Sequence, residues 1–446
     1  MRFPGVPLRR RPWRTGLTVL VLAAGLLAPA CGDSDDAGTP ETSAEADAAT
    51  ATPAPTETPT PPAPAEGPGE PDPDRMLTHA EVLSVDIGVR VNATEAEAAA
   101  VDYIADEFAS YGYEVTLDEF AFENRYPPGA VRADDFELDA LSLLGTHVGE
   151  ASGELAFIGR GDEEAYDDVD AHGAVVAVDR GYVSFGELYE IAASRGAAAV
   201  VILNDDEVPV VGDLDREAEL PVVSVGTGHR NDLINAQGAE VTVEASGTEA
   251  DSVNVVAEAP GTESCTVLAG AHHDTVPGSP GGNDNASGIA QVLEIARAVA
   301  ADEHRPGLCF VTFGAEESGL HGSQHVVTAL QDAGELPEAM VNLDVTGMGQ
   351  VLMAIGSHDL VRRSIDTGSE LGVEVTESFL PSNLRSDHVS FEEVGVPVLF
   401  FTTGPYDEYH TPADTFDILE PATVNDVGLV AYQTILDLYE GFAAGP

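Results

Sequence analysis

Seven side chains in the C-terminal half of the chain are of the types that bind metal ions and move protons. They are His272, Asp274, Asp284, Glu316, Glu317, Asp344 and His410. Two imidazoles and several carboxylates suit a pair of zinc ions, and one carboxylate remains for proton transfer. The set therefore predicts metal-assisted hydrolysis.

Four apolar runs precede these side chains and are typical of buried strands with polar ends. The runs are residues 265–271, 308–315, 339–344 and 397–402. Open parallel sheets bind ligands beyond the carboxyl ends of their strands. One crevice at that edge of a sheet is therefore expected to collect all seven side chains.

Asp284 lies in a loop rich in Gly and Asn, residues 281–288, which precedes an amphipathic helix. Asn285 and Ser287 are both suitable caps for that helix. Between strand end and helix start, Asp284 would keep both oxygens free to bridge two metal ions. An Asp in such a loop is also a common turn or capping residue, and the loop taken alone favours this second interpretation.

Six ordered motifs resemble those of the M28 zinc aminopeptidases. They are GAHHD (270–274), GNDNASG (282–288), GAEESGLHGS (314–323), VNLD (341–344), SDH (386–388) and YHTP (409–412). The resemblance extends upstream to residues 87–108, which are similar to the first helix of that domain. It thus covers nearly all of the chain after residue 75.

The resemblance implies a role for each residue of the site. His272 and Asp344 would hold one Zn²⁺, Glu317 and His410 the other, and Asp284 would bridge the two. Glu316 would be the general base, and Asp274 would orient His272 from outside the ligand set. Tyr409 would donate to the oxyanion, and Arg385 would shape the substrate pocket. These residues would hydrolyse the N-terminal bond of peptide substrates.

Several neighbouring polar residues are excluded from the predicted site. His273 should point away from His272, because adjacent side chains alternate along a strand. His321 and His325 share a helix face, but the segment lacks the Glu of a zinc-binding helix motif and is expected to be packed or solvated. Asp387 and His388 are expected to be structural or to support the ligands from outside, and not to be catalytic.

The N-terminus predicts export. Residues 1–30 contain a basic segment, an apolar run of signal-peptide length and small residues before Cys31. The arrangement resembles a bacterial lipobox, although Ala28 stands where Leu is more usual, so Cys31 is expected to carry a lipid that anchors the enzyme outside the cytoplasm. Secretion without lipidation is the alternative. Residues 31–74 have the Pro-rich, acidic composition of a disordered stalk.

The predicted fold class is α/β, with a mixed, mostly parallel sheet flanked by helices. Residues 135–248 contain four short apolar runs and one amphipathic segment. They resemble a protease-associated (PA) domain, small, β-rich and of α+β type, and nothing in them suggests chemistry. This domain would separate the two parts of the peptidase domain, residues 75–134 and 249–446.

Charge limits the partners of this chain. All 19 basic residues are Arg, against 78 acidic residues, and the net charge is −59. Signal-peptide cleavage would remove five Arg and no acid. Salt screens such self-repulsion, which suggests a halophilic source. The large negative charge excludes nucleic-acid binding.

Cys265 and Cys309 each lie seven residues before a site residue. A disulfide between them is possible, but two buried thiols are expected, because parallel neighbours often miss disulfide geometry.

Two alternatives to the aminopeptidase remain. A metallocarboxypeptidase or a glutaminyl cyclase-like enzyme would use similar ligands. A catalytically inactive surface binding protein is the other alternative, and the complete set of ligands argues against it. No pattern in the sequence specifies an oligomeric state.

Overall fold

The computed structural model describes residues 6–7, 69–134, 136–167, 169–379 and 385–443. The predicted signal peptide (apart from residues 6–7), Cys31 and most of the predicted stalk lie outside these residues. Within the described part of the chain, no helix is long and apolar enough to cross a membrane.

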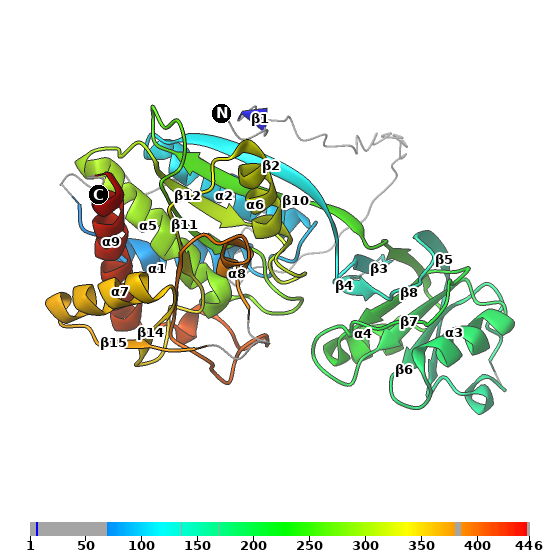
Figure 1. Cartoon of the computed structure of the whole chain (residues 1–446). Helices are drawn as coiled ribbons and strands as arrows, with labels where there is room; N and C mark the ends of the chain where they lie inside the picture. The colour runs from blue at the N-terminus through cyan, green and yellow to red at the C-terminus, as the bar shows by residue number, and fades with distance from the viewer. Residues whose placement is uncertain (1–5, 8–68, 135, 168, 380–384, 444–446) are drawn as a thin grey trace, which may run out of the picture. The chain divides into compact units, whose positions relative to one another are not determined.

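The peptidase part is built on a nine-stranded mixed sheet (Figure 1). In spatial order its strands are β1 (Val6–Pro7), β2 (Glu114–Glu123), β10 (Glu249–Glu258), β12 (Leu308–Phe313), β11 (Val267–His272), β13 (Ala339–Leu343), β16 (Val398–Thr402), β14 (Leu352–Gly356) and β15 (Val375–Glu377). The central strands β12, β11, β13 and β16 are mutually parallel. Each of these four strands covers most of one apolar run, so the predicted parallel core is confirmed.

Helices cover both faces of this sheet. On one face lie α1 (Pro73–Glu81), α2 (Glu95–Ser110), α5 (Ser287–Asp302), α7 (His358–Leu371) and α9 (Pro421–Ala443), and on the other lie α6 (His321–Ala333) and α8 (His388–Glu392). The strand sequences explain why both faces of the sheet are buried. In β11, Val267 and Ala269 pack in the core with α5, whereas Leu268 packs with α6 and α8, because successive side chains point to opposite faces.

The inserted unit is a closed seven-stranded barrel. Its strands, in spatial order, are β3 (Pro128–Ala133), β4 (Phe136–Ser142), β8 (Val222–Val225), β7 (Ala199–Leu203), β6 (Val175–Asp179), β5 (Gly149–Gly159) and β9 (Glu240–Ala245), with helices α3 (Phe185–Ser194) and α4 (Arg230–Asn235). Val175 and Ala177 belong to one core cluster, and Val176 and Val178 to another that includes residues of α3. The first strand begins at Pro128, ahead of the boundary at residue 135 that the sequence suggested.

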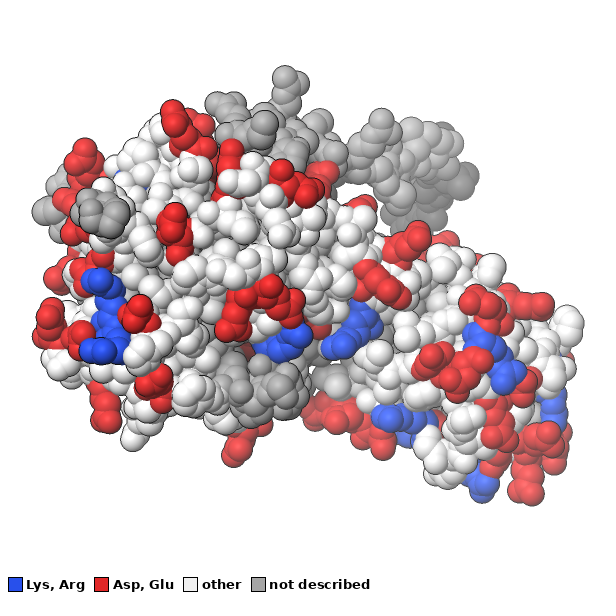
Figure 2. Space-filling view, in the orientation of Figure 1, with Lys and Arg blue, Asp and Glu red and all other residues white. Residues whose placement is uncertain are grey.

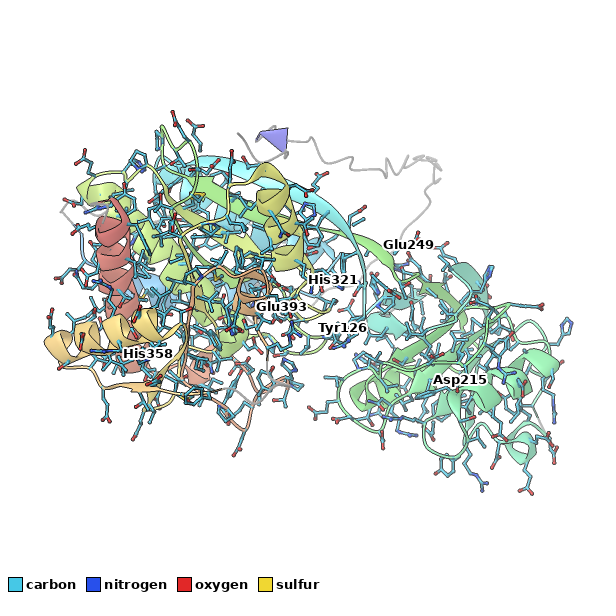
Figure 3. All side chains as sticks on the ribbon, in the orientation of Figure 1. Tyr126, Asp215, Glu249, His321, His358 and Glu393 are labelled. Carbon is cyan, nitrogen blue, oxygen red and sulfur yellow. A yellow bond between two sulfur atoms is a disulfide. The ribbon has the colours of Figure 1, made fainter. Side chains whose placement is uncertain are left out.

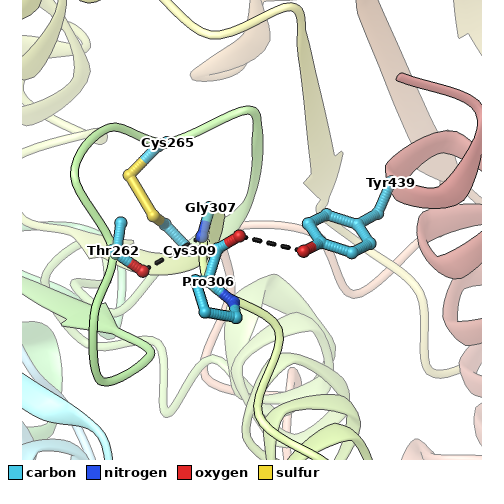
Figure 4. The surroundings of a disulfide bond; sticks show 6 residues. All are labelled: Thr262, Cys265, Pro306, Gly307, Cys309 and Tyr439. Carbon is cyan, nitrogen blue, oxygen red and sulfur yellow. Dashed lines mark hydrogen bonds between the residues drawn. A yellow bond between two sulfur atoms is a disulfide. The ribbon is translucent and has the colours of Figure 1, made fainter. Parts of the chain in front are cut away.

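Cys265 and Cys309 form a disulfide with a Cα–Cα distance of 5.7 Å (Figure 4). The expectation of two free thiols is wrong, and the strand register explains why. Cys309 in β12 pairs with Leu268 of β11, not with Cys265. Cys265 therefore lies outside the parallel ladder, in the turn before β11, where its side chain can reach the neighbouring strand.

Candidate metal centre

The ends of the parallel strands bring the predicted ligands together. His272 is the last residue of β11, Glu317 follows β12, Asp344 directly follows β13, and His410 lies in the loop after β16. Among the described residues, three overlapping groups of metal-binding side chains meet here, with ligand atoms within 4.8 Å of one another. They are His272, Asp284 and Asp344; Asp284, Glu317 and His410; and His272, Glu316 and Glu317.

Asp284 lies between the two histidines and faces both. Its Oδ1 is 3.1 Å from His272 Nε2, and its Oδ2 is 3.2 Å from His410 Nε2. The side chain that bonds the first turn of α5 is that of Asn285, whose Oδ1 accepts the backbone N–H of Gly288 at 3.0 Å. The interpretation of Asp284 as a capping residue is therefore wrong, because both of its oxygens are directed at imidazoles.

Each histidine also has a carboxylate of its own. Asp344 Oδ1 is 3.3 Å from His272 Nε2, and Glu317 Oε2 is 3.2 Å from His410 Nε2. The second oxygen of Glu317, Oε1, is buried and has no hydrogen-bond partner among the described residues. A buried carboxylate oxygen without a partner is costly, and a metal ion would satisfy it. The donor set, imidazoles and carboxylates, thus fits zinc.

The close carboxylates hold protons on the histidines when no metal is bound. Burial lowers the pKa of His410, but hydrogen bonds with Asp284 and Glu317 raise it more, to about 10. Burial likewise opposes the charge on His272, but Asp344 and Glu316 raise the pKa of this histidine well above its ordinary value. A metal ion must displace these protons, because only neutral imidazole is a ligand.

Glu316 has the environment of a proton carrier. Its side chain is 9% exposed and lines the cavity at the site. Burial raises the pKa of Glu316 well above its usual range, and Glu317 and Asp387 add to that effect while His272 opposes it. An elevated pKa favours a carboxylate that must accept a proton and then release it.

Asp274 supports the site more broadly than the sequence suggested. Its carbonyl oxygen is 3.1 Å from His272 Nδ1, closer than its carboxylate, which is 3.6 Å away. That carboxylate instead accepts the backbone N–H groups of Glu316 and Glu317, both at 3.1 Å. Asp274 therefore fixes one histidine through its main chain and both glutamates through its side chain.

The backbone around the ligands adopts unusual conformations. Ala315, Val345 and His410 have φ values of 56°, 56° and 58°, which is the left-handed region that non-glycine residues rarely occupy. The Asp284–Asn285 peptide bond is cis. Left-handed residues of this kind concentrate at functional sites, where the surrounding structure holds them.

Two supporting residues were not foreseen from the sequence. Asp414 is fully buried, and its carboxylate accepts the backbone N–H groups of Asn283 (2.8 Å) and Asp284 (3.1 Å) and the hydroxyl of Tyr406 (2.8 Å). Arg90 is also fully buried and donates to five main-chain carbonyls. The acceptors are those of Leu83, Gly88, His273, Pro280 and Gly281. The only indication of Asp414 in the sequence is its position two residues beyond the YHTP motif.

Ser386 and its neighbours form the support of Asp344. The Ser386 hydroxyl donates to Asp344 Oδ2 at 2.7 Å and accepts from Asn342 Nδ2 at 2.7 Å. Asp387 is fully buried, and the His388 ring stacks on Phe400 with centroids 4.4 Å apart. The SDH motif thus positions a predicted ligand and packs the core.

Tyr409 and Arg385 both line the cavity. The Tyr409 ring stacks on the His410 ring, with centroids 3.8 Å apart, and the side chain is 43% exposed. Burial and the acidic side chains, with Asp284 first among them, raise the pKa of Tyr409, so its hydroxyl keeps its proton. Arg385 is exposed and pairs with Glu393 at 2.6 Å.

The three histidines excluded by sequence lie outside the candidate centre. His273 contacts Thr312 at 3.2 Å and does not face the ligands. His325 stacks on Phe120 and lies 3.4 Å from Asp118, and the His321 ring packs on Phe122. No group of potential ligands in the described part of the chain includes any of the three.

The site opens into a cavity of about 510 Å³. Its walls carry acidic ligand candidates, two arginines and two tyrosines. The lining residues are Arg125, Tyr126, Asp284, Glu316, Glu317, Gly319, Leu320, Gln324, Asp344, Val345, Arg385, Tyr409 and His410. Arg125 and Tyr126 were not foreseen, because they come from the segment between β2 and β3, far from the motifs in sequence.

Comparisons with known proteins match both parts of the folded chain. Residues 254–435 match the model of Peptidase family M28, and residues 143–233 match that of the PA domain. The chain is 30% identical to Aminopeptidase YwaD of Bacillus subtilis over 371 residues, 78% of this chain and 80% of that protein. It is 29% identical over 424 residues to the Probable lipoprotein aminopeptidase LpqL of Mycobacterium tuberculosis, 82% of this chain and 84% of that protein.

The solved structure of BSAP, a zinc aminopeptidase from Bacillus subtilis, has a similar fold. The TM-score is 0.58 at 25% identity, and the match covers 82% of this chain and 94% of the other. The predicted fold class, with a mixed sheet and an inserted PA domain, is confirmed. The chain belongs to peptidase family M28 and carries a PA domain within its peptidase domain.

Proposed function

We propose that this metallopeptidase is a zinc-dependent aminopeptidase with two metal ions. His272 and Asp344 would hold one ion, Glu317 and His410 the other, and Asp284 would bridge them. The observation that supports this most strongly is the position of Asp284, with one oxygen 3.1 Å from His272 and the other 3.2 Å from His410. Relatives named as aminopeptidases and a similar structure described as a zinc aminopeptidase add support.

The chemistry divides between the ions and the side chains. Bound zinc supplies Lewis acidity that activates water and polarises a carbonyl. Glu316 takes the proton from the attacking water and returns it to the leaving amine, which requires the raised pKa that its burial produces. Tyr409, which lines the cavity and keeps its proton, donates a hydrogen bond to the oxyanion. Asp274 holds the backbone of Glu316 in position.

Cleavage at the N-terminus follows from the charge of the cavity. Asp284, Glu316, Glu317 and Asp344 line the cavity, so a protonated α-amine is attracted toward these carboxylates. The test compares Leu-p-nitroanilide with its N-acetylated form, with and without a chelator, at high salt. Chelator-sensitive hydrolysis of the free amine alone is expected. Hydrolysis of the blocked substrate, or of neither with zinc present, would reject the proposal.

Export and lipid anchoring at Cys31 are proposed from the N-terminal sequence. The relative named as a lipoprotein aminopeptidase supports this. In a bacterial host, a fatty-acid label should be incorporated into the wild-type chain and not into Cys31→Ser, which should appear in the medium instead. Labelling of the serine variant would reject Cys31 as the lipid site.

Adaptation to high salt is proposed from the charge balance. Figure 2 shows acidic side chains spread over the visible face, with few basic ones. Because salt screens their mutual repulsion, the melting temperature should rise between 0.1 and 2 M NaCl. An equal melting temperature across that range would contradict the proposal.

The domain division is proposed as residues 75–134 and 249–446 for the peptidase, with residues 135–248 as the PA domain. The seven-stranded barrel supports an inserted unit, although its strands span Pro128 to Ala245. Limited proteolysis should cut preferentially near these junctions. Resistance there, with cleavage inside the barrel, would contradict the division.

A further inference from the structure

Arg125 is one of the two arginines that line the cavity at the candidate metal centre. It is exposed and lines the same cavity as Glu316, Glu317 and Asp284. No carboxylate of the described residues lies within ion-pair distance of its guanidinium, whereas Arg385, the other arginine of the cavity, is paired with Glu393. In a chain with 78 acidic and 19 basic residues, an arginine without an acidic partner beside a reaction site is available to a ligand.

The backbone around Arg125 is tied to the candidate metal centre. Asn124 is 1% exposed, and its Oδ1 accepts the N–H of Tyr126 at 2.8 Å and the hydroxyl of Ser318 at 3.2 Å. Ser318 directly follows the ligand candidate Glu317. Asn124 N also donates to Thr248 O at 2.6 Å. The turn that carries Arg125 is therefore held by a buried residue that contacts the ligand loop.

Tyr126, labelled in Figure 3, lines the same cavity as Arg125 and Glu317. Burial raises the pKa of Tyr126, the charge of Glu317 adds to this, and the neighbouring Arg125, which is hydrogen-bonded to the hydroxyl, opposes it. The hydroxyl thus lies within electrostatic reach of both groups. The cavity accordingly has an acidic end at the metal ligands and a cationic group at Arg125.

A guanidinium recognises carboxylates through paired hydrogen bonds. We propose that Arg125 binds a carboxylate of the peptide substrate, so that the enzyme favours short peptides carrying one. This inference rests on the proposed aminopeptidase function. The carboxylate has two sources in such substrates: the C-terminus of a dipeptide, or the side chain of an acidic residue. Both present the same chemistry to Arg125, and matched substrates separate them.

The test compares kcat/KM within two pairs of substrates at one salt concentration. Leu-Leu against Leu-Leu-amide isolates the C-terminal carboxylate, and Leu-Asp-amide against Leu-Asn-amide isolates the side chain. A charge-assisted hydrogen bond at an exposed site corresponds to a preference of about tenfold. Wild type should show that preference in at least one pair, and the pair that shows it identifies the source.

Variants of Arg125 then test whether this residue causes the substrate preference. In Arg125→Gln the ratio should fall to about one, and Arg125→Lys should retain part of it, because lysine keeps the charge without the fork of donors. Arg362→Gln is the matched control: Arg362 is an exposed arginine in α7 that does not line this cavity. A ratio near one in wild type for both pairs, or an unchanged ratio in Arg125→Gln, would overturn the proposal.

Binding provides a readout that does not depend on turnover. Calorimetry with Glu316→Gln should show tighter binding of the carboxylate-bearing member of the favoured pair, and the double variant with Arg125→Gln should lose the difference. Hydrolysis of acetyl-Leu-Leu, or no hydrolysis of any substrate, would contradict the proposed function. Equal binding of both members of both pairs would contradict the role of Arg125.

Discussion

Asp414 provides a sharp test of how the predicted bridging ligand is positioned. In Asp414→Asn the side chain keeps its shape but loses its charge and one acceptor oxygen. The wild-type carboxylate accepts three donors: Asn283 N, Asp284 N and the Tyr406 hydroxyl. The new NH₂ group must face at least one of these donors, so at least one charge-assisted hydrogen bond is lost.

The expected magnitude follows from that loss. A hydrogen bond to a charged group contributes about 1.5–3 kcal/mol, and 1.36 kcal/mol corresponds to about tenfold in an equilibrium constant. Loss of a partner that orients a ligand typically lowers metal affinity by about 10- to 100-fold. We therefore expect zinc affinity to fall by about 10- to 100-fold in Asp414→Asn, and by a few-fold in Tyr406→Phe, which removes only one donor.

The assay is zinc competition with a chromophoric chelator, together with circular dichroism and the melting temperature of the metal-free protein. The matched control is Asp118→Asn, another buried carboxylate, which pairs with His325 away from the site and should leave zinc affinity unchanged. Zinc affinity within about twofold of wild type in Asp414→Asn, or an equal loss in Asp118→Asn, would refute this reasoning.

Three further predictions concern stability and proton release. Arg90→Met should lower the free energy of unfolding in urea by at least about 3 kcal/mol, because it removes five hydrogen bonds from a buried guanidinium to main-chain carbonyls; the surface substitution Arg132→Met should cost under about 1 kcal/mol, and equal losses would contradict the argument. Replacing both Cys265 and Cys309 with Ala opens a link across 44 residues and should cost about 4 kcal/mol in the same assay, whereas a loss under about 1 kcal/mol would not fit. Because His410 has a pKa of about 10 without metal, it is protonated at neutral pH, so zinc binding should release its proton and apparent affinity should rise with pH up to about 10; calorimetry in two buffers measures this, and no released proton would contradict it.

The sequence located the candidate ligands because strand ends are readable as patterns. His272 and Asp344 stand at the end of apolar runs, and the carboxyl ends of parallel strands meet at one edge. The role of Asp284, ligand or turn residue, could not be decided from the sequence of its loop alone. The decision depended on contacts in the folded chain: Asn285 accepts the Gly288 N–H, and both Asp284 oxygens face histidines.

The supporting residues escaped prediction because their contacts are distant in sequence. Arg90 reaches carbonyls more than 180 residues away, and Asn124 reaches Ser318. Asp414 is one of 78 acidic residues, so its type carries no signal, and only its contact with the backbone of Asp284 distinguishes it. The disulfide was missed for a related reason. Cys265 and Cys309 are equally distant in sequence from His272 and Glu316, which suggested that the two cysteines lie opposite each other on parallel strands. The register instead pairs Cys309 with Leu268.

The central claim is that Glu316 carries the proton while five other side chains hold the metal. Glu316→Gln removes the basic carboxylate and preserves the shape of the side chain. The decisive measurement is zinc content and kcat on a free-amine substrate for this variant beside wild type. Two zinc ions per chain with kcat lowered by about a hundred- to ten-thousandfold is the predicted result. Retained activity, or loss of a zinc ion together with activity, would contradict the assignment of Glu316.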